Sequence, residues 1–277
     1  MKTILITGTT SGIGQATAVE LARTGHRIIM ANRNREKANN VRQQIVQQTG
    51  NNEIQLLDLD LASQASVRAC AAAFLEQHSR LDILINNAGM MTPEQTITDD
   101  GFELQFAANA LSQLLLTLEL KTALLEAAPS QVIFVTSLMH KFGKLDPASF
   151  RGWPTYSGGG AYGQSKLVMT MLATELAEQL RDRRVTVNCL HPGAVNTGIL
   201  NSYPRFAQFF LRLLFATPEK GARTTLHLAT QDPGKLPTGK YFVNARESKT
   251  HKLVTDATAR AELLDECCNL LNIPAPI

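Results

Sequence analysis

Short apolar runs alternate along the chain with longer segments of helical periodicity, and this alternation constrains the fold more than any other pattern. Two of the runs, Ile83-Leu84-Ile85 and Val132-Ile133-Phe134-Val135, are continuously apolar, as strands of a buried parallel sheet are. A β-α-β-α succession of this kind predicts an α/β fold, with a doubly wound parallel sheet between two helical layers. The strands are expected at Thr3–Thr7, Arg27–Ala31, Glu53–Leu57, Leu81–Ile85, Gln131–Thr136 and Val185–Leu190.

Size and composition fit one domain of this kind. The chain has 277 residues, of which 44% are hydrophobic and 18% charged, so it can bury a core. We therefore expect residues 1–277 to form a single domain. The 27 basic residues are spread along the sequence and the net charge is only +3, which argues against nucleic acid as a partner.

The cysteines and the apolar stretches indicate where the protein works. Cys70, Cys189, Cys267 and Cys268 include no C-x-x-C pair, so no metal site is expected, and free thiols suit the reducing cytoplasm. The start, Met1-Lys2-Thr3, leads straight into an apolar run that is too short for a signal peptide. No stretch reaches the ~18 apolar residues of a transmembrane segment. We expect a cytoplasmic protein with at most peripheral membrane contact.

A glycine-rich turn joins the first strand to the first helix. The turn reads Thr7-Gly8-Thr9-Thr10-Ser11-Gly12-Ile13-Gly14, and helical periodicity follows over Gln15–Thr24. Glycines let the backbone approach a pyrophosphate, and the amides at a helix start supply donors and partial positive charge. A plain tight turn is the alternative, but the strand before it and the helix after it favour dinucleotide binding. The expected cofactor contacts in this turn are Gly8, Thr10, Ser11, Gly12, Ile13 and Gly14.

The end of the second strand predicts which dinucleotide binds. An acidic residue at this point would accept a hydrogen bond from the ribose 2′-hydroxyl of NAD. The sequence instead has Asn32 and then Arg33, so a 2′-phosphate meets no carboxylate and can pair with a guanidinium. We therefore expect NADP(H) in preference to NAD(H); the alternative for Arg33 is a plain surface charge. Arg35 and Lys37 are candidates to assist Arg33, but a solvated helix face is the favoured interpretation for both.

The next two strand ends supply further cofactor contacts. Asp58, with Leu59 beside it, is placed to accept a hydrogen bond from the adenine amino group, and the alternative for Asp58 is a helix cap. After the fourth strand, Asn87, Ala88 and Gly89 combine an amide with a small, flexible segment. Such a segment can lie directly against a cofactor.

A tyrosine and a lysine four residues apart indicate the reacting centre. Tyr162 and Lys166 lie one turn apart on one face of a helix that Tyr162 is expected to open. A free tyrosine titrates at about pH 10, so it needs a nearby cation to exchange protons at neutral pH. Ser137, after the fifth strand, is placed to bond a substrate oxygen, and Asn109 lies in the helical stretch Phe102–Leu116. A turn-forming serine and a satisfied buried amide are the alternatives.

These motifs, in this order, resemble the short-chain dehydrogenase/reductase family over almost the whole chain. The T-G-x-x-x-G-x-G motif matches Thr7, Gly8, Gly12 and Gly14; N-N-A-G matches Asn86 to Gly89; and Y-x-x-x-K matches Tyr162 and Lys166. The resemblance implies a Rossmann fold and a hydride transfer between a nicotinamide and an alcohol or carbonyl carbon, without a metal.

The resemblance also implies a role for each residue of the reacting centre. Tyr162 would be the general acid/base, and Lys166 would hold the nicotinamide ribose and lower the pKa of the tyrosine. Ser137 would orient the carbonyl, and Asn109 would support a proton relay through water. The loop after the sixth strand would contact the carboxamide through Pro192, Gly193, Val195 and Thr197, whereas the preceding His191 is expected to be structural.

Two further segments resemble the retinol dehydrogenase-like branch of the family. They are Met139-His140-Lys141-Phe142-Gly143 and His191-Pro192-Gly193. That branch implies NADP(H) and a lipophilic small-molecule carbonyl or alcohol of retinoid, steroid or aldehyde type. The region Lys141–Gly160, rich in glycine and proline, is expected to be a loop with at most one short turn.

The apolar segment Arg205–Phe215 has two interpretations. It can be part of a substrate lid around residues 196–217, which we favour, or an amphipathic helix on a membrane. Family members form dimers or tetramers, so a homodimer is one of the assemblies open to this chain. The rival function is a non-catalytic NADP(H)-binding protein that senses redox state, which would need the glycine turn but not Tyr162.

Overall fold

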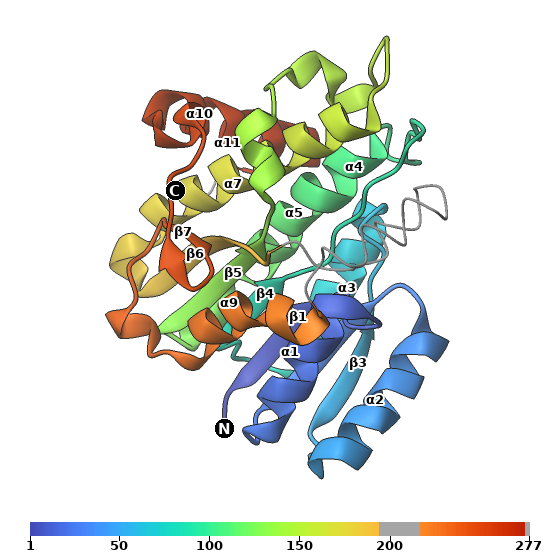
Figure 1. The fold of residues 1–277 in the computed structure, drawn as a ribbon, viewed down its shortest axis with the longest axis vertical. Helices are drawn as coiled ribbons and strands as arrows, with labels where there is room; N and C mark the ends of the chain where they lie inside the picture. Colours follow the sequence, from blue (N-terminus) through green and yellow to red (C-terminus); the bar gives the residue numbers. More distant parts are fainter. Residues whose placement is uncertain (194–216, 275–277) are drawn as a thin grey trace.

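The computed structural model describes residues 1–193 and 217–274. Its centre is one eight-stranded sheet, around which the helices are arranged (Figure 1). The strand order is β3-β2-β1-β4-β5-β6-β7-β8. All neighbours pair in parallel except β7 and β8, which are antiparallel. The predicted doubly wound parallel sheet is therefore confirmed. The strands are β1 (Thr3–Thr7), β2 (Arg27–Asn32), β3 (Ile54–Asp58), β4 (Ile83–Asn86), β5 (Ser130–Val135), β6 (Val185–His191), β7 (Tyr241–Val243) and β8 (Arg246–Glu247).

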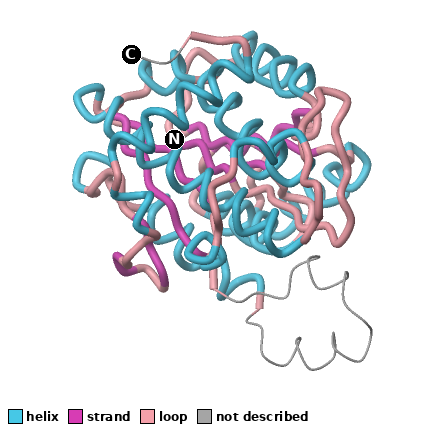
Figure 2. Tube along the Cα trace, turned by 90° about the horizontal axis from the view of Figure 1, so that it is seen from above, coloured by secondary structure: helices cyan, strands magenta, loops and turns pink. Residues whose placement is uncertain are grey.

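Helices cover both faces of the sheet, as the view from above shows (Figure 2). One face carries α1 (Gly12–Arg23), α2 (Arg35–Thr49) and α9 (Pro218–Thr230). The other carries α3 (Gln64–Gln77), α5 (Ser112–Glu119) and α7 (Gly158–Gln179), with α11 (Ala257–Leu271) packed on α7. Shorter elements are α4 (Leu104–Phe106), η1 (Ala107–Leu111), α6 (Lys121–Glu126), η2 (Leu138–Phe142), η3 (Pro147–Arg151), η4 (Arg181–Arg183), η6 (Pro233–Lys235) and α10 (Lys252–Thr255).

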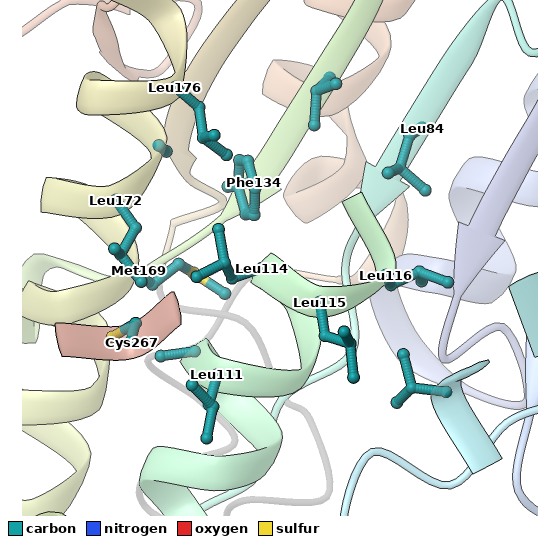
Figure 3. Packing of buried hydrophobic residues seen from close by; sticks show 14 of the residues in the cluster. Leu84, Leu111, Leu114, Leu115, Leu116, Phe134, Met169, Leu172, Leu176 and Cys267 are labelled. Carbon is teal, nitrogen blue, oxygen red and sulfur yellow. The ribbon is translucent and has the colours of Figure 1, made fainter. Parts of the chain in front are cut away.

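The larger hydrophobic core lies between the sheet and the layer of α5 and α7. Figure 3 shows the side chains that meet there, from α5, α7, η1 and α11 and from strands β4 and β5. They include Leu84, Leu111, Leu114, Leu115, Leu116, Phe134, Met169, Leu172, Leu176 and Cys267. Burying large apolar side chains on both sides of these helices fixes them to the sheet. This packing holds the polar residues in η1 and near the start of α7 at the carboxyl edge of the sheet.

Helix α7 starts earlier than predicted. The Ser157 side chain accepts a hydrogen bond from the Gly160 amide and caps the helix, which begins at Gly158 and not at Tyr162. Three successive glycines weaken helix propensity, so the sequence favoured a loop here. Gly158 lies so close to Thr92 that a Cβ would stand 2.2 Å from the Thr92 carbonyl oxygen. The glycine is needed for this contact between the loop after β4 and the start of α7.

The segment Lys141–Gly160 differs from the single loop that was predicted. It contains the end of η2, all of η3 and the first turn of α7. These turns are too short to produce a helical pattern of apolar residues. In the same way, α1 begins at Gly12 and not at Gln15, because the glycine turn itself forms the first helical turn.

Among the described residues, none of the helices is both long and apolar enough to cross a bilayer. The same part of the chain holds no cluster of His, Cys, Asp or Glu that could bind a metal ion. All four cysteines are free and buried. The single domain, the cytoplasmic location and the homodimer stay predictions, and the expected lid, but for Thr217, lies outside the described residues.

Candidate active site

The glycine turn between β1 and α1 has a backbone that only glycine adopts easily. Gly8 and Gly12 have φ values of +71° and +59°. At Gly14 a Cβ would lie 2.1 Å from the Gly8 carbonyl oxygen and 2.5 Å from Asn87 Nδ2, so a side chain has no room. The amides that open α1 are therefore brought to the carboxyl edge of the sheet, where a pyrophosphate can bind.

Two asparagines hold this turn in place. Asn87 Nδ2 donates to the carbonyl oxygens of Thr7 (2.8 Å) and Gly8 (3.1 Å). Asn32 Oδ1 accepts from the Thr9 amide at 2.7 Å, and Asn32 Nδ2 donates to Thr9 Oγ1 at 2.8 Å. Both side chains thus bond the protein itself, and their contribution to binding is to fix the shape of the turn.

A cleft of about 370 Å³ opens beside the turn. It runs along the ends of β1 to β4, which is where ligands bind in open α/β sheets. Its lining includes Gly8, Thr10, Asn32, Arg33, Asn34, Lys37, Leu59, Asp60, Leu61, Ala62, Ala88, Gly89, Met90 and Ala108. The close glycines, the helix start and two basic side chains fit a phosphorylated dinucleotide. Of the predicted contacts outside the turn, Arg33, Leu59, Ala88 and Gly89 line the cleft.

The polar end of the cleft contains residues that the sequence did not single out as contacts. Lys37, assigned to a solvated helix face, lines the cleft next to the exposed Arg33, as does Asn34. Asp58 is the last residue of β3 and forms an exposed ion pair with Arg35, with 3.3 Å between Arg35 Nη1 and Asp58 Oδ1. The local sequence pattern does not encode which group a side chain meets across the edge of the sheet. The contacts of Lys37 and Asp58 therefore could not be predicted from the sequence.

The predicted reacting residues converge at the inner end of the cleft. Gly89 lines the cleft and also lies next to the reacting residues. A Cβ built on it would stand 3.1 Å from Lys166 Nζ and 3.5 Å from Asn109 Oδ1. Tyr162 is almost fully buried, and the Ser137 side chain lies beside its hydroxyl. The tyrosine, the serine, the lysine and the asparagine are thus one group of neighbours, although they come from four elements.

Burial dominates the proton equilibria of this centre. It raises the pKa of Tyr162, and the neighbouring Ser137 hydroxyl offsets this in part. Burial lowers the pKa of Lys166 to about 8. Lys166 Nζ lies 5.7 Å from the centre of the Tyr162 ring and donates to the Val135 carbonyl oxygen at 3.2 Å. In the protein alone, burial therefore outweighs the neighbouring groups, and the pKa of Tyr162 lies above its usual value.

Asn109 lies in η1, a π-helical turn that interrupts the predicted helix Phe102–Leu116. Its Oδ1 accepts from the Met90 amide, and its Nδ2 donates to the Met90 carbonyl oxygen, both at 2.8 Å. Nδ2 also donates to Ser165 Oγ at 3.0 Å. The wide turn aims the amide at the loop after β4, so Asn109 ties that loop to α7. Its part in a proton relay stays a prediction.

The remaining predicted contacts lie at the edges of the site. Ser11 and Gly12 begin α1, and Ile13 is buried against α9. Pro192 and Gly193 follow β6, with Gly193 at a φ of +92°. Val195 and Thr197 lie outside the described residues.

Comparison with known proteins agrees with this geometry. The profile of the family described as short chain dehydrogenase matches residues 2–207. Human retinol dehydrogenase 11 is 35% identical to the chain, with 99% of this chain and 86% of the relative covered. Mouse retinol dehydrogenase 14 is 38% identical, with 95% and 84% covered.

Solved structures give the same result. A crystal structure of an uncharacterised protein from Mycobacterium paratuberculosis superposes with a TM-score of 0.80 at 29% identity, covering 100% of this chain and 96% of the other. The Pseudomonas aeruginosa RhlG/NADP complex gives 0.70 at 26% identity, covering 87% and 93%.

The chain belongs to the short-chain dehydrogenase family, as its fold and its group of tyrosine, lysine and serine indicate. Within that family it is similar to the retinol dehydrogenases. It is an oxidoreductase that acts on alcohol or carbonyl groups of small molecules.

Proposed function

We propose that this protein is an NADP(H)-dependent oxidoreductase that interconverts a lipophilic alcohol and its carbonyl compound. The observation that carries the proposal is the meeting of Ser137, Tyr162 and Lys166 beside Gly89, which lines the cleft next to the glycine turn. The names of the retinol dehydrogenases among its relatives support a lipophilic substrate of retinoid type, and the proposal extends to steroid- and aldehyde-like compounds.

The chain's own residues would orient the substrate and move one proton. A carbonyl oxygen placed between the hydroxyls of Ser137 and Tyr162 would accept a hydrogen bond from each. When bound, the nicotinamide supplies or accepts the hydride at the carbonyl carbon. In the direction of reduction, Tyr162 gives its hydroxyl proton to the substrate oxygen, and the Lys166 ammonium stabilises the tyrosinate left behind. Oxidation of the alcohol runs through the same groups in reverse.

The surface beside Ser137 supports a lipophilic substrate. Leu138, Met139 and Phe142 lie on η2, directly after Ser137, and their side chains are 39%, 37% and 77% exposed. Apolar side chains clustered at the edge of a site commonly contact an apolar ligand. A lipophilic chain attached to the reacting carbon would find these side chains next to it.

The preference for NADP(H) rests on Arg33 and Lys37. Both lie in the cleft past the end of β2, where the ribose 2′-position is expected, and no carboxylate follows Asn32 at the strand end. Arg33→Asp should therefore weaken NADPH by about 10- to 100-fold while leaving NADH unchanged or slightly tighter, because a carboxylate repels the 2′-phosphate and accepts from a 2′-hydroxyl. Titration of both cofactors by fluorescence measures this. An unaltered ratio of the two affinities would refute the assignment.

A substrate panel tests the proposed reaction. Retinoid, steroid, quinone and aliphatic carbonyl compounds are assayed by oxidation of NADPH, with NADH in parallel. We expect turnover with NADPH and the highest kcat/KM among apolar carbonyl compounds. Tight NADPH binding without turnover of any compound would instead favour the non-catalytic redox sensor.

A further inference from the structure

A group of buried polar side chains lies behind Ser137, outside the dinucleotide cleft. His140 and Tyr241 are 0% and 3% exposed, and His191 ends β6 beside them. Three of their atoms have no hydrogen-bond partner among the described residues: His140 Nε2, His191 Nδ1 and the Tyr241 hydroxyl. Buried polar atoms usually find partners, so three neighbouring exceptions next to a reacting residue require an explanation.

His140 holds the backbone of Ser137. The Ser137 carbonyl oxygen accepts two hydrogen bonds from this residue, one from the His140 amide at 3.2 Å and one from His140 Nδ1 at 2.7 Å. Because a carbonyl can only accept, Nδ1 carries the proton, and in the neutral ring Nε2 is then an acceptor. The same turn fixes the Ser137 side chain, whose Oγ accepts from the Met139 amide at 3.2 Å.

Tyr241 is the neighbour that suits the free acceptor. Its ring meets the His140 ring edge-on, with the centroids 4.6 Å apart and the planes at 63°. Cys189 of β6 pairs with Tyr241 of β7, and His191 pairs with Val243, so Tyr241 and His191 project from the same face of the sheet. Burial lowers the pKa of His140 and brings the pKa of His191 to about 4, so both rings are neutral at physiological pH. The Tyr241 ring therefore packs against a neutral imidazole whose Nε2 has no donor among the described residues.

We propose that His140 is a positioning residue that fixes the carbonyl-orienting Ser137, and that the Tyr241 hydroxyl, linked to His140 Nε2 through one buried water, holds the ring in the required tautomer. A fixed tautomer keeps the proton on Nδ1 and so keeps the bond to the Ser137 carbonyl. The Ser137 hydroxyl then stays at the distance from Tyr162 that a substrate oxygen needs. The inference rests on the proposed function, because it concerns the same reacting centre.

Two substitutions at His140 separate positioning from simple core filling. His140→Asn puts an amide donor near the place of Nδ1, so the bond to the Ser137 carbonyl can form. His140→Gln puts its amide near the place of Nε2 and leaves the Ser137 carbonyl without that donor. The two side chains have the same chemistry and a similar size, so each is the matched control for the other.

The expected result is a difference in kcat between them. His140→Asn should keep most of the kcat of the wild type, whereas His140→Gln should lose about 10- to 100-fold, as small displacements of a reacting group do. The Kd of NADPH should not change in either variant, because the dinucleotide cleft lies along other strand ends. Tyr241→Phe, which keeps the ring and removes the hydroxyl, should lower kcat and leave KM for the carbonyl substrate unchanged.

Equal kcat values for His140→Asn and His140→Gln, whether both normal or both reduced, would overturn the proposal, as would a normal kcat for Tyr241→Phe. Circular dichroism and NADPH binding check that every variant is folded. Failure of the proposed function is visible separately, because the wild type would then turn over no compound. Ser137→Ala, which removes the oriented hydroxyl itself, sets the lower limit of kcat in the same assay.

Discussion

Lys166 is a cation in surroundings that disfavour its charge. Its side chain is buried, and its ammonium has one oxygen partner among the described residues, the Val135 carbonyl, with Met169 Sδ at 4.0 Å. Burial lowers the pKa of this lysine to about 8 from 10.5. The protein thus gives up stability to hold the ammonium beside Tyr162, which is typical of a functional site.

This lysine makes stability depend on pH in a defined direction. Above about pH 8 the folded state releases the Lys166 proton while the unfolded state keeps it, so unfolding binds a proton and stability rises with pH. Relative to Lys166→Met, the wild type should gain about 2 kcal/mol of unfolding free energy between about pH 7.5 and about pH 9.5. Urea unfolding of both proteins across this range measures the difference. If the unfolding free energies of the two proteins changed in parallel with pH, the pKa of Lys166 would not be lowered.

Residue identities were easier to predict than residue partners. The sequence identified Asn32 and Asp58 as residues at strand ends near the cofactor. The structure places Asn32 in two hydrogen bonds with Thr9 and Asp58 in an ion pair with Arg35. Which group a polar side chain meets depends on elements far away in the sequence, and a local pattern does not contain that information.

At the scale of elements, the backbone packs most closely in the turn between β1 and α1. Gly14→Ala would place a methyl group 2.1 Å from the Gly8 carbonyl oxygen, so the turn must open. We expect the variant to fold and to bind NADPH at least about 10-fold more weakly, because the amides of the turn move away from the pyrophosphate. Isothermal titration calorimetry measures the affinity.

Gly159→Ala is the matched control for this change. No atom lies within 4 Å of a Cβ at Gly159, in the first turn of α7. The substitution should leave NADPH binding unchanged and raise the unfolding free energy by up to about 1 kcal/mol, since alanine favours a helix. Equal affinities of the two variants would mean that the glycine turn does not shape the cofactor site.

The long elements were predictable and the short ones were not. Each of the six strands expected from apolar runs is present, with ends shifted by at most two residues. The pair β7 and β8 was missed because runs of three and two residues show no periodicity. The π-helical turn around Asn109 was missed because one widened turn leaves the apolar pattern of the flanking helices intact.

At the scale of the whole molecule, the C-terminal helix α11 packs against α7, which carries Tyr162 and Lys166, and stabilises it. Arg260 of α11 and Glu175 of α7 form a buried ion pair, with 3.1 Å between Arg260 Nε and Glu175 Oε2. Arg260 Nη1 also donates to the Val254 carbonyl oxygen at 2.9 Å. The end of the chain thus holds the element that carries Tyr162 and Lys166.

Breaking this pair should destabilise the whole protein. Arg260→Ala leaves the buried Glu175 carboxylate without its partner, so we expect the unfolding free energy to fall by about 3–5 kcal/mol. The exposed pair of Arg181 and Glu178 is the control, and Arg181→Ala should leave the melting temperature unchanged. Thermal unfolding of both variants measures this. Equal melting temperatures of the two variants would show that the ion pair between α11 and α7 does not stabilise the protein.

The doubly wound, mostly parallel class of the sheet followed from the sequence because few alternatives exist. Six strands separated by helical segments form a parallel sheet, and right-handed crossovers leave few strand orders. The exposed apolar surface beside Ser137 could not be predicted in this way, because the exposure of Leu138, Met139 and Phe142 depends on how η2 lies against α7.

The most direct test of the proposed chemistry is the single-turnover rate of hydride transfer in Tyr162→Phe. The variant keeps the ring and the helix but has no hydroxyl proton, so we expect normal NADPH affinity and a rate about 100- to 10,000-fold below the wild type. Stopped-flow absorbance of NADPH with an apolar aldehyde gives both quantities. A rate equal to that of the wild type would contradict the assignment of Tyr162 as the acid/base.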